Sequence, residues 1–327
     1  MWLDLDLEGE LCSAEAVATE DARIAALTEV FRTDSADVRV GIGDDAAVLA
    51  DGLVLSVDVC VEGTHFRRDF GPLEVLARRA AVGALSDLAA MGACPRALLS
   101  SLVVPGTLSD SELLALHRGL AAAATEVGAA VVGGNLAAGG ELSLTTTVVG
   151  RSTRPLRRCG AKVGDAVYLS GPPGDAGLGL LALLAGRSSA FADRWLWPRA
   201  HIEEGLSLRG VASACVDVSD GLLRDLHHLC AASGVGAEIE LAAIPRGGGF
   251  EAEARALAQD PDEVLLGSGE AYVLLFTAPA SLTWATRIGT VVSEPGVFVR
   301  DRSGRRIARS PRGFDHFASG ELTPVRG

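Results

Sequence analysis

Acidic residues in four separate segments are the part of this sequence best suited to chemistry. In the first segment, Asp44 and Asp45 follow the glycine-rich turn Gly41–Gly43 directly after a predicted strand. Glycines allow a tight turn, so the two neighbouring carboxylates project from one loop. Like charges side by side repel each other unless a cation binds between or beside them. Taken alone, this segment favours a solvated turn over a cation site.

The next two acidic residues lie in regular structure. Asp58 ends an otherwise apolar strand, and Asp87 lies inside a helix predicted for Leu73–Met91. Helical spacing places Asp87 on a stripe of small and apolar residues, where an unpaired charge is costly to bury. Arg78 and Arg79 lie too far along the helix to be good partners for it. Two explanations for Asp87 therefore stay open, contact with a metal ion or ligand and an ordinary ion pair.

The fourth segment, Asp217–Gly221, lies where a predicted strand runs into a predicted helix. Ser219 or Asp220 as the N-cap of that helix would explain one of the polar side chains. A cap does not explain Asp217, which follows directly on an apolar run. A hydroxyl, a carboxylate and a glycine at a helix N-terminus also suit a phosphate and metal site. A cap alone and a cap combined with a site both stay open.

Charge and motif content exclude several classes of protein. The chain has a formal net charge of −13, which argues against nucleic acid or an anionic membrane surface as the main partner. Lys162 is the only lysine and lies outside any Gly-Lys-Ser/Thr sequence, which excludes a Walker-type phosphate loop. The His-Arg-Asp loop of protein kinases is also missing from the sequence. Phosphate bound by this chain must be neutralised by metal ions, arginine or backbone amides.

Two further polar features give weaker signals. The glycine-rich stretch Gly171–Gly179 joins a strand to a helix and could offer amides to phosphate, although a plain turn is favoured. His65 follows Glu62, Gly63 and Thr64 close to the strand that carries Asp58. The histidines show no His-Glu-x-x-His spacing, so the sequence does not predict a zinc protease site.

The length of 327 residues suggests two domains of ordinary size. A basic, proline-containing segment without periodicity, Arg151–Arg158, marks the expected boundary, with one domain over residues 1–150 and another over residues 151–327. Strands and helices alternate in both parts, which predicts an α/β or α+β fold. The predicted helices cover residues 14–32, 73–91, 109–127, 177–185 and 219–233. The predicted strands cover residues 38–40, 53–59, 98–104, 129–132, 142–149, 166–170, 237–241, 273–277 and 297–300, with a glycine-rich turn between the fourth and fifth.

Targeting signals and cysteines indicate the cellular compartment. The first residues are acidic where a signal peptide would be basic, and no apolar run is long enough to span a membrane. The six cysteines are scattered without a Cys-x-x-Cys pair, so we expect reduced and mostly buried side chains. These observations predict a cytoplasmic protein with no membrane partner.

The acidic segments, taken together and in this order, resemble those of the thiamine-monophosphate kinase family. That family belongs to the ATP-binding superfamily that includes aminoimidazole ribonucleotide synthetase. The resemblance covers nearly the whole chain, and the stretch Ser86–Ala93 is quite specific to the family. The matching segments are Gly41–Asp45, Asp58, Gly63–Phe66, Leu85–Ala93, Gly133–Asn135, Arg158–Asp165, Asp217–Leu222 and Gly313–Phe317.

The resemblance implies a fold, an activity and a set of site residues. The fold is a two-domain, aminoimidazole ribonucleotide synthetase-like one, whose N-terminal sheets pair into a barrel across a homodimer. The activity is direct transfer of the γ-phosphoryl group of ATP to thiamine monophosphate, with several Mg²⁺ ions and no side-chain nucleophile. The implied metal ligands are Asp44, Asp45, Asp58, Asp87, Asn135, Asp217 and Asp220. The implied ATP-binding residues are Gly134, Asn135, Arg158 and Ser219, and the implied substrate-binding residues are His65, Glu270 and Phe314.

The chain departs from the family pattern at three places, one of which is Val57, where the family usually has a threonine. The family usually has Gly-Gly-Asp where this chain has Asn135 as the third residue, which keeps an oxygen ligand and loses a negative charge. The family also has Gly-Gly-Glu-Asp-Tyr-Glu where the segment Ser268–Val273 carries Ala271 and Val273 at two carboxylate positions. Two alternatives follow. The chain could use the same ATP site with a different acceptor, or be an impaired paralogue that binds nucleotide as a scaffold.

Overall fold

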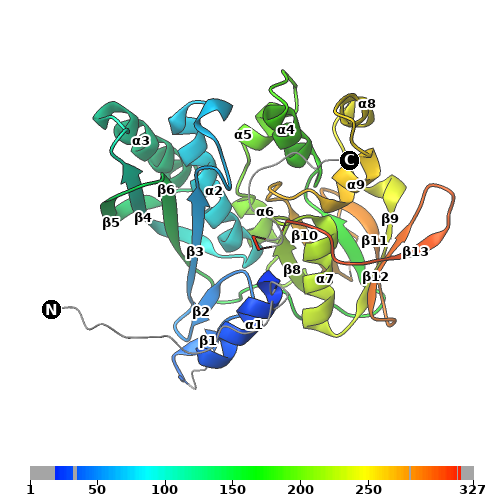
Figure 1. The fold of residues 1–327 in the computed structure, drawn as a ribbon. Coiled ribbons are helices and arrows are strands. Elements are labelled where there is room, and N and C mark those ends of the chain that lie inside the picture. Colours follow the sequence, from blue (N-terminus) through cyan, green and yellow to red (C-terminus); the bar gives the residue numbers. More distant parts are fainter. Residues whose placement is uncertain (1–18, 32–34, 280, 315, 318–327) are drawn as a thin grey trace, which may run out of the picture. The chain divides into compact units, whose positions relative to one another are not determined.

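The fold is described from a computed structural model, which covers residues 19–31, 35–279, 281–314 and 316–317 (Figure 1). The chain divides into a small unit, Met1–Thr33 with Asp315–Gly320, and a large unit, Asp34–Phe314 with Glu321–Gly327. The described part of the small unit contains one helix, α1 (Glu20–Val30), whose N-cap Thr19 accepts a hydrogen bond from Ala22 N. Both sheets and the remaining helices belong to the large unit.

A six-stranded sheet occupies the N-terminal half of the large unit. Its strand order is β1-β2-β3-β6-β4-β5, and all neighbours are antiparallel except β4 and β5. Residues along β6 alternate between buried and half-buried positions, as expected for a sheet with helices on one face. The strands are β1 (Val38–Val40), β2 (Ala47–Leu49), β3 (Leu53–Val61), β4 (Cys94–Pro105), β5 (Ala130–Gly139) and β6 (Ser143–Arg151).

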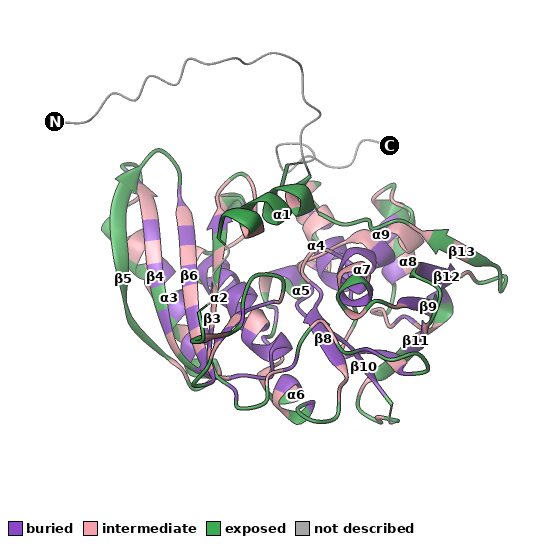
Figure 2. Ribbon diagram, turned by 90° about the horizontal axis from the view of Figure 1, so that it is seen from below, coloured by how far each residue is buried: buried purple, intermediate pink, exposed green. Residues whose placement is uncertain are grey.

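Two long helices, α2 (Leu73–Ala90) and α3 (Asp110–Glu126), pack against this sheet and against each other (Figure 2). Ser109 and Glu112 form a reciprocal capping box that starts α3. Helix α2 is different, because it is buried on almost every side and also contacts the C-terminal half. Its many alanines and Gly83 fit this position, since small side chains let neighbouring backbones approach closely.

A seven-stranded sheet forms the C-terminal half, in the order β13-β12-β9-β11-β7-β10-β8. Only β9 and β12 are parallel neighbours. The strands are β7 (Ala166–Leu169), β8 (Ala214–Asp217), β9 (Gly236–Glu240), β10 (Leu274–Ala278), β11 (Thr286–Val292), β12 (Gly296–Arg300) and β13 (Arg306–Arg309). The helices are α4 (Asp175–Leu184), α5 (Ala192–Leu196), α6 (Ile202–Ser207), α7 (Leu222–Ser233), α8 (Phe250–Ala256) and α9 (Pro261–Gly267). Short 3₁₀ turns lie at Arg68–Phe70 and Leu241–Ala243.

Three hydrophobic clusters fill the large unit. One lies under the six-stranded sheet and a second surrounds the seven-stranded sheet. The third contains Ala89 and Ala90 of α2 together with Tyr168 and Phe276 of the second sheet. Because this cluster joins α2 to the C-terminal half, apolar packing as well as polar contacts holds the two halves of the large unit together.

The mixed α/β class with two sheets is confirmed, and every predicted helix and strand has a counterpart. The helix predicted for residues 14–32 has α1 as its described part, and the remainder lies outside the described residues. Two details were wrong. The pair Gly133 and Gly134 lies inside β5, which continues to Gly139, and not in a turn. Helix α7 begins at Leu222, after the segment that was expected to cap it.

The cysteines fit the expected pattern only in part. Cys60, Cys215 and Cys230 are buried, whereas Cys94 and Cys159 are half-buried, and these five described residues are free thiols. Cys12 lies outside the described residues. Among the helices that the structure describes, none combines the length and the apolar character needed to cross a membrane.

The close approach of α2 and α3 depends on Gly119 and gives a testable prediction. A methyl group at this position would overlap the carbonyl oxygen of Glu74 and lie 2.8 Å from the Arg78 nitrogen. We expect Gly119→Ala to lower the free energy of unfolding by about 1–3 kcal/mol, because the two helices must move apart. Gly106→Ala is the control, since nothing lies within 4 Å of the added carbon. Urea unfolding of both variants measures the difference, and equal stabilities would contradict the packing.

Candidate active site

The Asp44–Asp45 turn is not solvated, contrary to what the segment alone favoured. The exposed fractions of the two side chains are 4% and 1%. Asp44 Oδ1 accepts a hydrogen bond from the Arg158 backbone nitrogen at 2.9 Å. Asp45 Oδ1 accepts from Arg158 Nε and Nη2 at 2.9 and 2.6 Å. Arg157 Nε also donates to Asp44 Oδ2 at 3.3 Å, so two adjacent residues from the start of the C-terminal half hold the turn between β1 and β2.

The second carboxylate oxygen of Asp45 is the clearest sign of a missing ligand. Oδ2 is buried and has no hydrogen-bond partner among the described residues. Burial raises the pKa of Asp45, and the neighbouring Arg158 only partly offsets this. A buried carboxylate oxygen without a partner is costly, so this atom suits a bound cation.

Two adjacent residues of α2 join the two halves of the large unit. Ser86 Oγ donates a hydrogen bond to Asp217 Oδ2 at the end of β8, at 2.5 Å. Asp87 Oδ2 accepts a hydrogen bond from Ser56 Oγ on β3, also at 2.5 Å. Because Ser86 and Asp87 are neighbours, the helix brings the carboxylates of both halves to one place.

An ordinary ion pair of Asp87 with the arginines of its own helix is not what the structure shows. Arg78 pairs with Glu126 and Arg79 pairs with Glu270, each at 2.6 Å. Asp87 is thus left with the Ser56 hydroxyl as its hydrogen-bond partner in the described structure. An ion pair within the helix therefore does not explain why an acidic residue lies on that face.

Asp45, Asp87 and Asp217 lie close enough to repel one another. Burial, followed by the charges of Asp217 and Asp45, raises the pKa of Asp87 well above its usual range. Burial and then the charge of Asp45 raise the pKa of Asp217 to about 7, although Ser86 and Arg158 pull in the opposite direction. The cluster therefore retains protons near neutral pH unless a cation balances it.

The cluster by itself does not enclose an ion. Within the described ranges, no three Asp, Glu, His or Cys side chains gather closely enough to hold one metal. Mg²⁺ keeps several water or phosphate ligands and takes only one or two carboxylates in such sites. The donor set fits that pattern, with Asp45, Asp87 and Asp217 as the residues that could each supply an oxygen.

The start of α7 is organised by a residue that the sequence reasoning did not single out. Neither Ser219 nor Asp220 caps the helix with its side chain, because Gly221 occupies the N-cap position with a φ of 128°. Instead, Asp225 Oδ2 accepts hydrogen bonds from the backbone nitrogens of Gly221 and Asp220 at 3.1 and 3.2 Å. The expected cap was wrong, and the side chains of Ser219 and Asp220 are not used for it. An acidic residue in the first turn of a helix was the available signal.

Asp58 lies at the seam between β3, α2 and the C-terminal half. Its Oδ1 accepts a hydrogen bond from the Val59 backbone nitrogen at 2.7 Å. A methyl group on Gly83 would lie 2.9 Å from Asp58 Oδ2 and 3.1 Å from Tyr272 Oη. Both polar atoms therefore approach the helix at Gly83, where only glycine leaves room for them.

The three residues expected on the acceptor side come from distant parts of the chain. His65 Nδ1 accepts a hydrogen bond from Val61 N at 3.0 Å, and its ring centre lies 6.5 Å from that of Phe314. Phe314 N donates to the Asp220 carbonyl oxygen at 2.9 Å, and Arg224 donates to the Phe314 carbonyl oxygen. The structure thus brings His65 and Phe314 together beside the Asp217–Gly221 segment. Asp315, which follows, lies outside the described residues.

Gly134 and Asn135 are not brought to this cluster within one chain. Gly134 shares a row across the sheet with Asp58, through Ser100 and Thr146. Three strand spacings separate Gly134 from Asp58, which amounts to about 14 Å. Asn135 belongs to the next row and, like all of β5, is exposed (Figure 2).

Ala271 and Val273, two of the positions that depart from the family pattern, are buried in the C-terminal half. Ala271 and Val273 have exposed fractions of 9% and 5% and belong to the hydrophobic cluster around the seven-stranded sheet. Small apolar side chains at these positions therefore complete the core. That the segment carrying them lies near the substrate stays a prediction.

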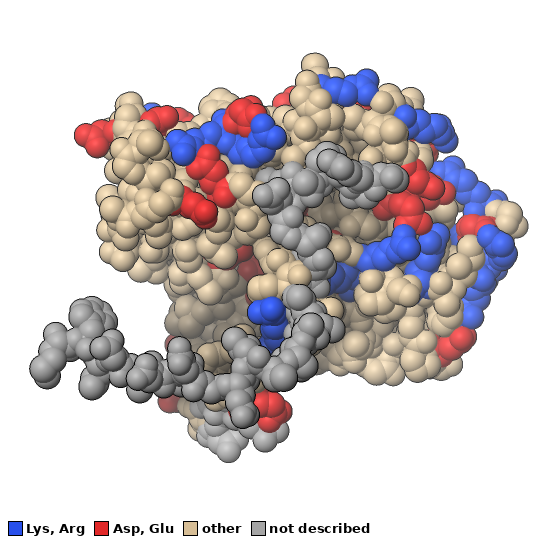
Figure 3. Space-filling view, viewed as in Figure 1, with Lys and Arg blue, Asp and Glu red and all other residues tan. Residues whose placement is uncertain are grey.

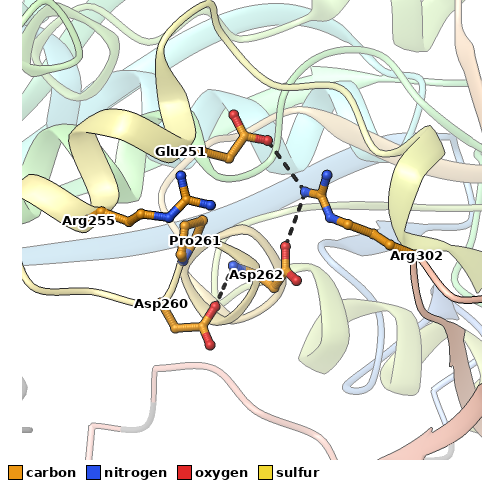
Figure 4. A pocket seen from close by; sticks show the side chains of 6 residues that line it. All are labelled: Glu251, Arg255, Asp260, Pro261, Asp262 and Arg302. Atoms are coloured by element: carbon orange, nitrogen blue, oxygen red, sulfur yellow. Dashed lines mark hydrogen bonds and ion pairs between the residues drawn. The ribbon is translucent and has the colours of Figure 1, made fainter.

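A recess of about 480 Å³ on the outer side of the C-terminal half is separate from the carboxylate cluster (Figure 4). Arg302 crosses it and contacts Glu251 at 3.4 Å and Asp262 at 3.3 Å, while Asp260 accepts from the Asp262 nitrogen. Acidic and basic side chains also intermingle over the C-terminal half on the face in Figure 3, where Arg306 pairs with Glu238 at 2.7 Å. Much of the surface charge there is internally balanced, unlike the buried cluster.

Comparison with known proteins identifies the class of this fold and site. The N-terminal domain of AIR synthase related protein matches residues 43–152, and the C-terminal domain of the same family matches residues 162–302. The structure of the Escherichia coli hydrogenase maturation protein HypE covers 94% of this chain with a TM-score of 0.68 at 21% identity, a likeness of fold alone. The chain is therefore a two-domain protein of the AIR synthase related class.

Relatives with higher identity narrow the class to one family. The thiamine-monophosphate kinases of Salmonella typhimurium and Aquifex aeolicus are each 34% identical, over 92% and 84% of this chain and 98% and 92% of their own lengths. The structure described as AaThiL complexed with AMPPCP and TMP is 31% identical and covers 94% of this chain and 100% of its own, with a TM-score of 0.85. This chain belongs to the thiamine-monophosphate kinase family.

The raised pKa of Asp217 predicts an unusual pH dependence. The folded protein keeps this proton up to about pH 7, whereas a free aspartic acid releases it near pH 3.8. Between these values the folded state binds more protons than the unfolded state, so the stability contributed by Asp217 falls as the pH rises. We expect Asp217→Asn, without divalent metal, to gain about 1 kcal/mol or more over the wild type between pH 5 and pH 8.

The measurement is thermal unfolding in EDTA across this pH range. Asp110→Asn, on the exposed first turn of α3, is the control and should keep a constant difference from the wild type. A constant difference for Asp217→Asn as well would show that Asp217 does not titrate as described. Added Mg²⁺ should stabilise the wild type more at pH 8 than at pH 5, since protons compete with it for the carboxylates.

Proposed function

We propose that this protein is a Mg²⁺-dependent kinase that transfers the γ-phosphoryl group of ATP directly to thiamine monophosphate, giving thiamine diphosphate. The observation that carries the proposal is the likeness over nearly the whole chain to a structure that contains AMPPCP and TMP. The clustered carboxylates Asp45, Asp87 and Asp217 support it independently, because phosphoryl transfer needs charge neutralisation and positioning more than a nucleophilic side chain.

The carboxylate cluster has the donor set of a magnesium–phosphate site. Asp45 offers a buried oxygen without a partner, and Asp87 and Asp217 have carboxyl groups whose raised pKa values reflect uncompensated negative charge. When bound, Mg²⁺ would neutralise phosphate oxygens and favour in-line attack. Asp44, Asp58 and Asp220 extend the acidic surroundings on three sides as further ligands of metal or metal-bound water.

The remaining roles divide between the two substrates. Arg158 clamps Asp45 and keeps a quarter of its side chain exposed, so it can meet a phosphate oxygen while holding the turn. Ser219 lies next to Asp220 at the start of α7, on the phosphate side. His65, Glu270 and Phe314 form the acceptor side. The implied roles of Gly134 and Asn135 stay a prediction, because within one chain these residues lie on the distant edge strand.

We also propose that the protein is a homodimer, and that each copy has two domains, residues 1–150 and residues 151–327. Two copies would pair their N-terminal sheets into a barrel. The fully exposed β5 supports this arrangement, since it is an edge strand that carries Val132 and Leu136 with 62% and 52% of their side chains exposed. An apolar, unpaired edge strand is otherwise an aggregation hazard. A cytoplasmic location stays a prediction from the cysteine pattern.

The dimer is tested by charging that strand. We expect the wild type to sediment as a dimer and the double variant Val132→Glu, Leu136→Glu to sediment as a monomer, because charges block edge pairing. Leu114→Glu is a matched control, since Leu114 has an exposed fraction of 59% and belongs to helix α3 and not to the edge strand. A wild-type monomer, or a double variant that stays dimeric, would contradict the arrangement.

The activity is tested by product formation. Purified protein incubated with Mg·ATP and thiamine monophosphate is expected to form thiamine diphosphate. Asp45→Asn, Asp87→Asn and Asp217→Asn should each lower kcat/KM by about 100-fold or more, which corresponds to about 3 kcal/mol of transition-state stabilisation. Asp110→Asn on the surface should keep wild-type activity.

The alternatives predict different results in the same assay. Absence of thiamine diphosphate across a wide Mg²⁺ range would refute the proposed acceptor. ADP release with another phosphorylated or carboxylated acceptor would then indicate a changed specificity, and tight Mg·ATP binding without turnover would indicate a scaffold.

A further inference from the structure

A buried arginine of α2 makes contacts that the carboxylate site does not explain. Arg79 has an exposed fraction of 2%, and its Nε donates a hydrogen bond to the Trp195 carbonyl oxygen at 3.0 Å. Its guanidinium lies 3.9 Å from the centre of the Trp195 ring and 5.7 Å from that of Tyr272. A fully charged group held between two aromatic faces is fixed in position, because a guanidinium stacks on such rings as well as pairing with carboxylates.

The partner of this arginine is Glu270, and only one of its two oxygens is used. Arg79 Nη2 lies 2.6 Å from Glu270 Oε2, and Trp195 Nε1 donates a hydrogen bond to the same atom. No hydrogen bond from the described residues reaches Oε1, and 23% of the side chain is exposed. Arg79 and Trp195 therefore fix Oε2, whereas Oε1 can accept a hydrogen bond from a ligand.

The backbone around Glu270 is held in a conformation that non-glycine residues rarely adopt. Glu270 and Tyr272 have φ values of 65° and 53°. Glu270 N donates to the Ser219 carbonyl oxygen at 2.7 Å, and Tyr272 N donates to that of Val218 at 2.9 Å. Such backbone strain persists only where surrounding contacts enforce it. The segment is thus bound to the same loop that carries Asp217 and Asp220, which fixes the distance between Glu270 and the carboxylate cluster.

We propose that Arg79 and Trp195 are positioning residues that hold Glu270 so that its Oε1 accepts a hydrogen bond from an N–H group of the phosphoryl acceptor. This inference rests on the proposed function, and thiamine monophosphate has both a cationic ring and an amino group. The guanidinium and the indole N–H act through Glu270 and do not touch the substrate. They determine how well the acceptor binds, and they leave the affinity for ATP to the carboxylate cluster.

The adjacent arginine of the same helix is a matched control. Arg78 has an exposed fraction of 8%, pairs with Glu126 through Nε and Nη2 at 2.8 and 2.6 Å, and donates to the Pro198 carbonyl oxygen at 3.1 Å. It matches Arg79 in residue type, helix, burial and charge pairing. It differs in having no contact with Glu270, so Arg78→Met reports the cost of losing a buried arginine as such.

The test compares acceptor and ATP affinities in these variants. We expect Arg79→Met and Glu270→Gln to raise the KM for thiamine monophosphate about tenfold or more, as for loss of a charge-assisted hydrogen bond, with the KM for ATP changed less than about twofold. Arg79→Lys should recover part of the loss, because it keeps the charge without the fork of donors. Arg78→Met should leave both KM values near wild type.

Trp195→Phe provides a second variant in case Arg79→Met does not fold. It keeps a ring against the guanidinium and removes only the N–H that holds Glu270, so it should raise the acceptor KM selectively. Equal changes in both KM values of Arg79→Met and Trp195→Phe would mean that these contacts only stabilise the fold. An effect of Arg78→Met as large as that of Arg79→Met would mean the same. Either result would overturn the inference.

Calorimetry separates failure of this inference from failure of the proposed function. Binding of thiamine monophosphate is measured in the presence of Mg²⁺ and a non-hydrolysable ATP analogue. Wild-type binding that is weakened in Arg79→Met supports the inference even if no product forms. Wild-type binding that is unchanged in Arg79→Met overturns the inference alone. A wild type that binds no thiamine monophosphate overturns both.

Discussion

The structure is organised around buried negative charge that the protein itself does not fully balance. Asp45, Asp87 and Asp217 come from three different segments; burial raises the pKa of all three, and the charge of Asp45 adds to this at Asp87 and at Asp217. Arg158 compensates one of them, and single hydroxyls of Ser56 and Ser86 hydrogen-bond to the other two. A fold that served stability alone would exchange such a group for apolar packing. In the proposed function, a cation and its phosphate ligand would complete the balance.

Helix α2 is the element that makes this arrangement possible. Over eight positions it presents Arg79 to Glu270, Gly83 to Asp58 and Tyr272, Ser86 to Asp217 and Asp87 to Ser56. A helix with polar contacts in several directions must be buried all round, which explains its run of alanines and the absence of a solvent-facing stripe. The same helix also contributes Ala89 and Ala90 to the apolar cluster between the halves. Helix α2 therefore positions both the carboxylate cluster and Glu270.

Local patterns predicted the elements and the acidic residues well, because those signals are short-range. The capping pair Ser109 and Glu112 and the bounds of α2 are visible as residue types at fixed spacings. The sequence could not show that the Asp44–Asp45 turn is buried, since the residue that covers it, Arg158, lies 113 positions away from Asp45. The cap of α7 was misassigned because Asp225 reaches back to Gly221 and replaces the expected hydroxyl. Nor could the sequence show that Ala271 and Val273 belong to the hydrophobic core of the C-terminal half.

The distances in sequence between partners also bear on how the protein is made. Ser86 and Asp217 are 131 positions apart, and Phe314, near the end of the described chain, donates to the carbonyl of Asp220. Contacts of this range close only after long loops have been ordered, so they form late in folding. During synthesis, the first sheet and α2 emerge long before the strand that carries Asp217. For that interval the nascent chain holds Ser86 without Asp217, and the contact between Phe314 and Asp220 cannot form until almost 100 further residues have followed Asp217.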